Sequence, residues 1–363
     1  PIVIDQNPHP SGASINSYGI IHGGLRYLQS FNLARWNESR QAQSWYIDRF
    51  PRHVRPLRCV MPLYRRTMRS PALFAAARGL DRSLRLAFGR RVPLPPDSAC
   101  DREALLDGYP IARDGLIGGA IWHDAYIVDP SALLAEMLAQ VEARGGTVLR
   151  STRATALAMQ GANLRGLHLC DIETGREHRL ASEQIFDCTG SSAGALLAQQ
   201  TNRRLPTAAT LAFNLLLDIP APPGRDAYAL SPSAGSGRSY FFRQVPGGTL
   251  AGTFYRAAPG AMDAQPHQQD VERALLTVAQ CLPSLRLSMS KVLAVHAGLL
   301  PDQDGTGARL VASDRHLQPG PVGYHLLLGG KLTTAPLLSE RAARAIRCAG
   351  VDHIGDRLEN RHA

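Results

Sequence analysis

The feature that most constrains the fold is a strand that ends in two glycines and leads directly into a helix. Residues 324–328 form an apolar run, Gly329-Gly330 follow as a turn, and residues 335–348 have helical periodicity. Such a turn brings free backbone amides and the positive end of a helix to one point, where they stabilise negative charge. The alternative is an ordinary glycine turn that leaves Lys331 on the surface. In both cases the segment predicts an α/β fold.

A second apolar run ends in the same kind of small-residue turn. Residues 185–188 precede Thr189-Gly190, and the glycine lets the backbone approach a ligand at the carboxyl end of the strand. Many strands of α/β proteins end in this way, so the run alone does not identify a site. Upstream, Asp129-Pro130 begin a helix that Gly145-Gly146 end. A helix, short hairpin-like strands and a further strand are typical of an α/β nucleotide-binding domain with an antiparallel excursion.

The middle of the chain has a different pattern, in which strand-like runs alternate with proline and glycine turns. Predicted strands lie at residues 210–218, 239–243 and 249–255, and a predicted helix lies at residues 270–281. We therefore expect two domains. Residues 1–204 and 293–363 form the first, which includes a strand at residues 1–5 and a helix at residues 32–50. Residues 205–292 form a separate, mainly antiparallel α+β substrate domain.

The composition excludes several classes of protein. With 363 residues, of which 44% are hydrophobic and 19% charged, the chain can bury a large core. No apolar run approaches the roughly 18 residues of a spanning helix, and the first residues lack the pattern of a signal peptide. We therefore expect a soluble, cytoplasmic protein. The six cysteines are scattered singly, without the spacing of a zinc site, so no metal centre is expected.

The net charge of +10 is concentrated in residues 51–91, the basic segment, which contains eleven arginines and a single acid, Asp81. Interleaved apolar side chains favour an amphipathic surface that meets anionic lipid headgroups, where each basic residue contributes about 1 kcal/mol. A solvated basic face that keeps the protein soluble fits the pattern equally well. Nucleic-acid binding is not favoured, because lysine is nearly absent and no recognised binding motif accompanies the segment.

A third segment, residues 21–28, places His22, Arg26 and Tyr27 around Gly23-Gly24. An isolated arginine and tyrosine on a helix usually form only a salt bridge and a core contact. Together with residues 31–57, however, this segment resembles a block of the FAD-dependent glycerol-3-phosphate dehydrogenases, which are oxidoreductases of the DAO type. Gly329–Thr334 is similar to the same family's closing motif almost residue for residue, and the segments between follow the family's order.

The resemblance covers nearly the whole chain and implies a fold, a cofactor and a reaction. The fold would be a Rossmann-like FAD-binding domain of the glutathione reductase type, interleaved with the substrate domain. The enzyme would be an FAD-dependent dehydrogenase or oxidase that transfers hydride from a small-molecule substrate to flavin N5, with a quinone or another acceptor taking the electrons. The family has basic, membrane-facing structure where this chain has its basic segment, which favours a peripheral location on the inner face of the membrane.

The resemblance also assigns residues. His123 could accept the hydroxyl proton of the substrate, although a lone histidine is more often a satisfied polar residue. Asp5 matches the acid that holds the adenosine ribose. The expected catalytic residues are Lys331, Arg26, Tyr27, His123 and Asp124. The expected FAD contacts are Asp5, His22, Gly23, Gly24, Thr189, Gly190, Gly329, Gly330, Lys331, Leu332, Thr333 and Thr334.

The chain departs from the family pattern at its start. The family begins with a strand and a G-x-G-x-x-G turn that cradles the FAD pyrophosphate, whereas this sequence begins at the next strand, and no similar turn occurs elsewhere. We therefore expect an FAD-binding domain that lacks its first strand and turn, and favour a sequence that is part of a longer reading frame. The alternative function is a flavin-domain remnant or partner subunit without redox activity, which binds a membrane or a protein through the basic segment.

A second departure concerns the substrate. Leu300 and Ser313 stand where the family has phosphate-binding arginines, and Arg315 is displaced by two positions. Residues 212–215 replace the family's Lys-Gly-Ser-His block. A phosphate dianion needs such donors. We therefore expect an alcohol, hydroxy acid or amine that carries less charge than glycerol 3-phosphate.

Overall fold

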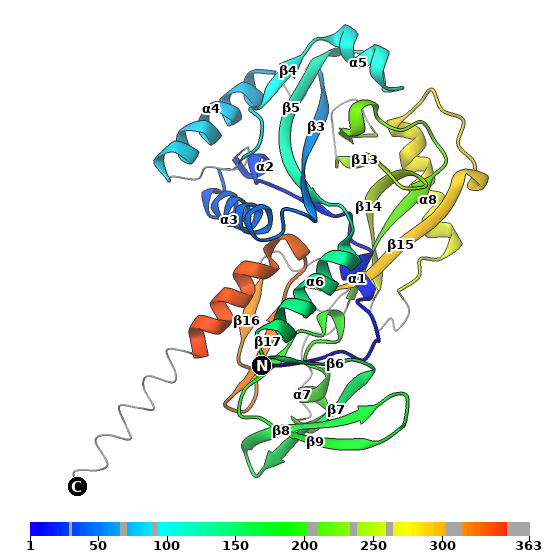
Figure 1. The fold of residues 1–363 in the computed structure, drawn as a ribbon. Helices are drawn as coiled ribbons and strands as arrows, with labels where there is room; N and C mark the ends of the chain where they lie inside the picture. Colours follow the sequence, from blue (N-terminus) through cyan, green and yellow to red (C-terminus); the bar gives the residue numbers. More distant parts are fainter. Residues whose placement is uncertain are drawn as a thin grey trace.

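The largest part of the fold is a mixed sheet of nine strands, the large sheet, in the upper half of Figure 1. The computed structural model describes residues 1–28, 31–65, 71–88, 93–201, 209–232, 238–258, 264–302 and 314–346. The strands follow the order β15-β11-β14-β13-β12-β3-β5-β2, and β4 pairs with β5. Their bounds are β2 (Ile20–Ile21), β3 (Val54–Tyr64), β4 (Ser98–Cys100), β5 (Leu116–Ile127), β11 (Ala209–Leu217), β12 (Ala227–Leu230), β13 (Tyr240–Val245), β14 (Gly248–Ala258) and β15 (Val292–Pro301).

The large sheet joins strands from distant parts of the sequence. Its pairs are antiparallel, apart from the parallel pair of β12 with β3. Helix α8 (Gln268–Cys281) packs on it through Val271, Leu275 and Val278, which belong to the main hydrophobic core. The sheet combines residues 209–258 with strands from residues 20–127 and 292–301. Segments that the sequence divides between two domains therefore share one sheet, and the two-domain division itself stays a prediction.

Parallel strands of the kind expected for a nucleotide-binding domain occur in two smaller sheets. Strand β1 (Ile2–Ile4) pairs in parallel with β6 (Thr147–Leu149), and β10 (Ile185–Asp187) pairs in parallel with β17 (Tyr324–Leu328). Strand β16 (Arg315–Leu317) runs antiparallel on the other side of β17. The two sheets share one core, because Ile4 and Leu149 pack against the cluster that contains Tyr324 and Leu326. The expected α/β fold is confirmed, as are the strands predicted at residues 1–5, 185–188 and 324–328. Strand β16 was not predicted.

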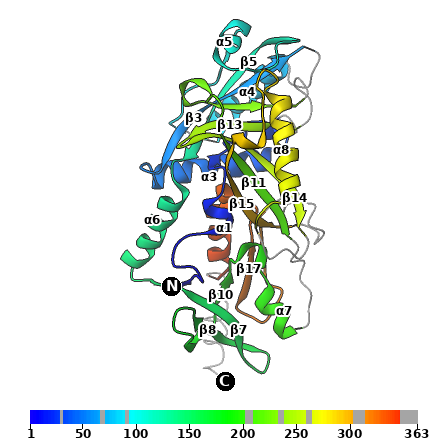
Figure 2. The ribbon, with the colours of Figure 1, turned by 90° about the vertical axis from the view of Figure 1, so that its right-hand side faces the viewer.

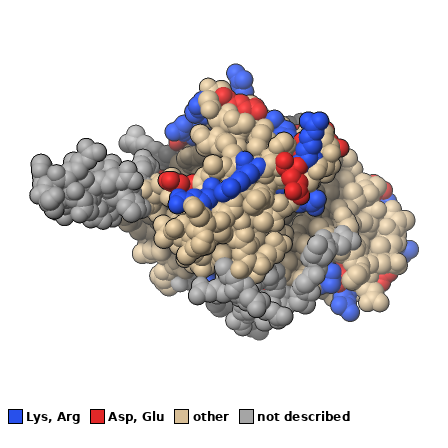
Figure 3. Space-filling view, turned by 90° about the horizontal axis from the view of Figure 1, so that it is seen from below, with Lys and Arg blue, Asp and Glu red and all other residues tan. Residues whose placement is uncertain are grey.

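The antiparallel excursion is also confirmed. Strands β7 (Thr152–Gln160), β8 (Asn163–Asp171) and β9 (Glu177–Ala181) form a separate three-stranded sheet, which lies at the lower end of the molecule in Figures 1 and 2. On the face seen from this end, basic side chains lie at separate places among uncharged ones, several of them beside acids (Figure 3). Helix α7 (Ala195–Thr201) packs against β7.

Helices α3 (Leu33–Arg49) and α6 (Pro130–Ala143) begin at side-chain caps. Asn32 accepts a hydrogen bond from the Arg35 N–H at the start of α3, and Asp129 accepts from Ser131 and Ala132 at the start of α6. A final helix covers residues 335–346, and the predicted end at Cys348 lies outside the described residues. The other helices are α1 (Gly12–Ile15), α2 (Leu25–Leu28), α4 (Pro71–Ala87) and α5 (Arg102–Gly108). Short 3-10 turns are η1 (Gly190–Ser192), η2 (Pro223–Arg225), η3 (Met289–Lys291) and η4 (Leu332–Thr334).

The basic segment contains two elements that the sequence did not reveal, the long strand β3 and the helix α4. Pro56 and Pro62 argue against a strand in the sequence, because proline cannot donate a hydrogen bond to a sheet ladder. In the structure β12 pairs with β3 only at Cys59 and Val60, so neither proline interrupts that short ladder. Strands β5 and β15 were also not predicted.

The arginines of the basic segment are partly neutralised within the protein. Arg58 pairs with Asp226, and Arg85 pairs with the fully buried Asp81, which also binds Arg40 from α3. Arg66, Arg69, Arg90 and Arg91 lie outside the described residues. In the part of the chain that the structure describes, no helix has the length and apolar character needed to cross a membrane.

Candidate active site

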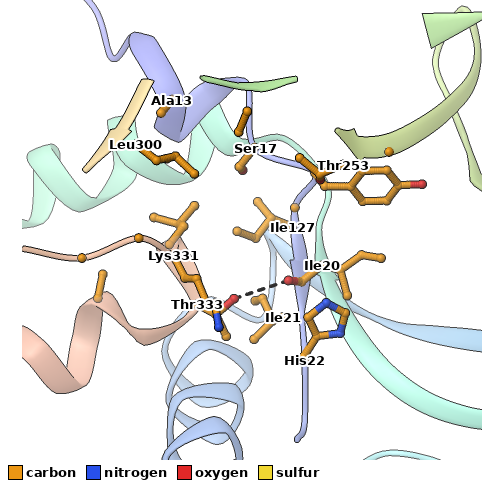
Figure 4. Close-up of a pocket in the computed structure, with 18 of the residues that line it drawn as sticks. Ala13, Ser17, Ile20, Ile21, His22, Ile127, Thr253, Leu300, Lys331 and Thr333 are labelled. Carbon is orange, nitrogen blue, oxygen red and sulfur yellow. Dashed lines mark hydrogen bonds between the residues drawn. The ribbon is translucent and has the colours of Figure 1, made fainter. Parts of the chain in front are cut away.

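A cavity of about 730 Å³ lies between the large sheet and the turns that follow β10 and β17 (Figure 4). One wall consists of turn residues, which include Gly190, Gly329 and Gly330. The other wall consists of side chains from strands of the large sheet, and α1 with the loop after it covers a further side. A volume of this size and a position at the carboxyl ends of parallel strands are typical of a cofactor or substrate site. The three predicted motifs therefore converge on one place.

The turn after β17 is held in position by its neighbours. The Tyr46 hydroxyl of α3 donates to the Leu332 carbonyl at 2.7 Å, and the Thr333 hydroxyl donates to the Ile20 carbonyl at 3.4 Å (Figure 4). The turn continues through η4 into the helix at residues 335–346, so the positive end of that helix faces the turn. This wall offers backbone amides and a positive potential rather than side-chain acids.

On the opposite wall, His22 and Asp124 form a hydrogen-bonded pair. Their Nδ1 and Oδ2 atoms lie 2.9 Å apart, and both residues line the cavity. Asp124 also accepts from the Gly23 N–H at 2.7 Å and from the Trp122 Nε1–H at 3.0 Å. Burial alone would raise the pKa of Asp124, but the hydrogen bonds from His22, Gly23 and Trp122 hold that pKa below its usual value. Asp124 therefore remains a carboxylate that orients the imidazole of His22.

Strand alternation separates the neighbours His123 and Asp124. Trp122 and Asp124 line the cavity, and side chains of successive strand residues point to opposite faces. His123 lies on the other face of β5, where its backbone N–H donates to Asp97 at 3.3 Å. Its side chain sits near Asp97, Arg58 and Asp226, and burial lowers its pKa. The structure thus brings Asp124 to the cavity and leaves His123 outside the residues that line it.

Lys331 lines the cavity and contacts Tyr27, another of the expected catalytic residues. The Lys331 Nζ donates to the Tyr27 hydroxyl at 3.1 Å, which joins the turn after β17 to helix α2. The Arg26 side chain lies outside the described residues. Lys331 and Tyr27 therefore lie side by side, with Lys331 at the cavity wall.

The predicted FAD contacts divide into two groups. The residues that line the cavity are His22, Gly24, Gly190, Gly329, Gly330, Lys331, Leu332 and Thr333. The other four, Gly23, Thr189, Thr334 and Asp5, are not among the lining residues. Gly23 donates to Asp124, Thr189 donates to Asp187 through its N–H and hydroxyl, and the Thr334 hydroxyl donates to the Lys331 carbonyl. Asp5 ends β1 and accepts from the Asn7 N–H at 2.8 Å, away from the lining residues.

Several cavity residues were missed by sequence reasoning. The Thr253 hydroxyl donates to Asn214 Oδ1 at 2.8 Å, and Asn214 donates to the Asn16 carbonyl at 3.2 Å. Arg238, Tyr255 and Phe241 complete the same side. Asn214 did carry a signal, since it is the single polar amide in the apolar run of β11, and buried polar groups need partners.

Comparison with known proteins places the whole described site within one family match. Residues 1–345 match the family described as FAD dependent oxidoreductase. The chain belongs to this family. FAD is therefore the cofactor against which the cavity has to be tested.

Individual relatives are distant. A probable mitochondrial glycerol-3-phosphate dehydrogenase from Dictyostelium discoideum is 23% identical over 93% of this chain and 56% of its own length. Glycerol-3-phosphate dehydrogenase from Synechocystis is 25% identical over 92% of this chain and 63% of its own length. The chain thus spans less than two thirds of these curated relatives. Among solved structures, the FAD complex of glycerol-3-phosphate dehydrogenase from Bacillus halodurans matches 97% of this chain, with a TM-score of 0.71 at 18% identity. L-proline dehydrogenase from P. horikoshii matches 95% of this chain, with a TM-score of 0.67 at 14% identity. These structures share the fold.

Two features of the cavity are compatible with a bound FAD. The Ser17 hydroxyl is buried at the cavity without a hydrogen-bond partner among the described residues, so a polar ligand would satisfy it. A Cβ added at Gly190 would meet no atom within 4 Å, and Gly190 has a φ of +66°. The space over this turn is therefore open to a ligand that the backbone can approach closely.

Proposed function

We propose that this chain carries the active site of an FAD-dependent dehydrogenase or oxidase that oxidises a small alcohol, hydroxy acid or amine. When bound, FAD supplies the hydride acceptor at flavin N5. The turns after β10 and β17 would hold the flavin, and the strands of the large sheet would hold the substrate. The observation that carries this proposal is the His22–Asp124 pair, which lies on the same cavity as the turn from Gly329 to Thr333.

His22 is suited to accept the proton that the substrate hydroxyl or ammonium loses. Asp124 engages Nδ1 at 2.9 Å, which leaves Nε2 as the ring nitrogen that can meet a ligand. A neutral imidazole with its proton on Nδ1 has its lone pair on Nε2, so it can act as a base. Once His22 has taken the proton, the adjacent carboxylate stabilises the positive charge. Asp124 is therefore a positioning residue and His22 the proton acceptor.

Negative charge at the opposite wall is stabilised by the turn after β17. Its free amides and the positive end of the helix at residues 335–346 lie on one side of the cavity, and Lys331 adds a full charge there. The contact of Lys331 with Tyr27 holds that charge at the cavity wall.

The apolar wall at β15 argues against glycerol 3-phosphate as the substrate. Leu299 and Leu300 line the cavity, where a phosphate-binding site would need donors. Arg315 lies in β16, is exposed, and is not among the lining residues. Ser313 lies outside the described residues.

Anaerobic reduction of the FAD-loaded protein tests the proposed function. Substrate panels of small alcohols, hydroxy acids and amines, with glycerol 3-phosphate included, would be mixed with the protein while the flavin band at about 450 nm is followed. We expect one panel to bleach the band and glycerol 3-phosphate to leave it unchanged. Bleaching by glycerol 3-phosphate alone would overturn the substrate proposal. A flavin that no panel reduces would favour a remnant or partner subunit without redox activity.

Exposed apolar residues on α4 support a second proposal, peripheral binding to an anionic membrane. Leu86 is 75% exposed and Phe88, just beyond the helix, is 57% exposed, with the exposed Arg82 on the same helix. Co-sedimentation with vesicles that contain anionic lipid, compared with neutral vesicles, would test this surface. Binding that the double substitution Leu86→Ser and Phe88→Ser leaves unchanged would contradict it.

A further inference from the structure

Arg238 is a cavity residue that packs on aromatic rings. It lies just before β13 and lines the cavity together with Tyr255 of β14. Its guanidinium carbon is 4.2 Å from the centre of the Tyr255 ring and 5.9 Å from the centre of the Tyr240 ring. Stacking on an aromatic face fixes the plane of a guanidinium and leaves the N–H groups at its edge available to other partners.

No carboxylate neutralises Arg238 among the described residues. Other arginines of the same region are paired, for example the neighbouring Arg256, which binds Asp270 of α8 at 3.0 Å. Successive residues of β14 point to opposite faces of the sheet. Tyr255, on which Arg238 stacks, faces the cavity, whereas Arg256 faces helix α8 and its acid. Arg238 is exposed, so its charge is hydrated in the free protein and can exchange water for a ligand.

The acids and bases that line the cavity are out of balance. The bases are Arg238, Lys331 and His22, whereas Asp124 is the single acid among the lining residues. Asp124 is 2% exposed and already accepts hydrogen bonds from His22, Gly23 and Trp122. The cavity therefore presents positive charge that its own acid does not compensate, which favours an anionic ligand.

We infer that Arg238 binds the carboxylate of the substrate, which makes the substrate a small hydroxy or amino acid. This inference rests on the proposed function and selects one of its substrate classes. A carboxylate accepts two parallel N–H bonds from the edge of a guanidinium. Tyr255 would hold the guanidinium plane during this contact. A phosphate dianion is disfavoured, because the apolar side chains of Leu299 and Leu300 occupy another part of the wall instead of donors.

Binding of small anions tests the role of Arg238 directly. Glycolate, lactate and glycine would be titrated against the purified chain, with inorganic phosphate as the comparison anion. The signals are calorimetric heat and the intrinsic tryptophan fluorescence, to which Trp122 at the cavity wall contributes. The titration is done with and without FAD, and flavin retention is read separately from the band at about 450 nm. If no flavin is retained, the proposed function fails, while the anion titration still decides the role of Arg238.

The matched variants are Arg238→Gln, Arg238→Lys and Arg273→Gln. Arg273 is exposed on α8 and is not a lining residue, so its substitution removes the same charge elsewhere. We expect Arg238→Gln to weaken carboxylate binding roughly 10-fold to 100-fold, Arg238→Lys to weaken it less, and Arg273→Gln to leave it unchanged. The inference is overturned if Arg238→Gln binds carboxylates as the wild type does, or if both glutamine variants weaken binding equally. Failure of every carboxylate to bind, or tighter binding of phosphate, overturns it as well.

Discussion

The two walls of the cavity use different parts of the chain. The wall formed by the turns after β10 and β17 consists mainly of backbone and small residues, with Gly190, Gly329 and Gly330 at its surface. The wall formed by the large sheet consists of side chains, among them His22, Asp124 and Asn214. The first wall suits a cofactor that is the same in every member of a family, and the second suits a substrate that differs. Binding of flavin and choice of substrate should therefore respond to substitutions in different walls.

The largest effect is expected from His22→Asn, on the side-chain wall. Loss of a proton acceptor lowers the rate of flavin reduction about 10²-fold to 10⁴-fold. FAD binding should change little, because the proposed role of His22 is toward the substrate and replaces the FAD contact expected from the family resemblance. His123→Asn is the matched control, because His123 lies on the other face of β5. Rapid-mixing measurements of reduction with the best substrate compare the two. A slow His123 variant beside a normal His22 variant would place the proton acceptor at His123 and contradict the assignment.

Gly190→Val should act on the backbone wall and change FAD binding instead. Gly190 has a φ of +66°, which costs a residue with a Cβ about 1–2 kcal/mol, and the added side chain enters open space at the cavity. We expect FAD affinity to fall about tenfold or more.

Gly161→Val is the control that distinguishes backbone strain from a side chain that fills the space of the cofactor. Gly161 has a φ of +61° and equally open surroundings, but it lies in the turn between β7 and β8, outside the cavity lining. Flavin titrations should show a normal affinity for this variant. Equal losses in both variants would mean that backbone strain alone, rather than contact with the cofactor, weakens binding.

A smaller effect is expected where α3 supports the backbone wall. Tyr46→Phe removes the hydroxyl that donates to the Leu332 carbonyl, which should lower the free energy of unfolding by about 1 kcal/mol. In Tyr109→Phe the hydroxyl removed has no partner among the described residues, so stability should stay the same or rise slightly. Urea unfolding measures both. If the two variants were equally stable, the bond from Tyr46 would not hold the turn.

The smallest effect concerns pH and the strand that leads into the turn. His325 of β17 is buried, and its Nε2 donates to Gln184 Oε1, so its Nδ1 accepts from His316 at 2.8 Å. Burial and the neighbouring His316 lower the pKa of His325 in the folded state. The unfolded chain then binds more protons between that lowered pKa and about 6.5. The free energy of unfolding should be highest above about pH 6.5 and decline as the pH falls toward the folded-state pKa of His325.

His325→Phe should remove this decline, and urea unfolding at a series of pH values would show the difference. The same slope in the wild type and the variant would mean that His325 does not titrate in this range.

The backbone wall was predictable from the sequence, and the side-chain wall was predictable only in part. A glycine pair between a strand and a helix determines local geometry, so Gly329, Gly330 and Lys331 could be assigned from adjacent residues. Helix caps such as Asn32 and Asp129 are local signals of the same kind. Residues of the three motifs line one cavity, and the roles assigned to them stay predictions.

The side chains of the other wall could not all be predicted, because their positions depend on strands that pair across long stretches of sequence. His22 and Asp124 meet because β2 pairs with β5 in a register that sets Ile21 opposite Ala125. A shift of one residue would have turned His123 toward the cavity instead, and the sequence does not give the register. Arg238 was missed for the same reason, since its stacking on Tyr255 depends on how β13 and β14 pair.

The most direct test of the two-wall account is the visible absorption of the purified protein after incubation with FAD and gel filtration. We predict resolved flavin bands at about 370 and 450 nm that elute with the protein, in the wild type and in His22→Asn, and weaker bands in Gly190→Val. A folded protein that elutes without flavin, even after incubation with excess FAD, would contradict the account.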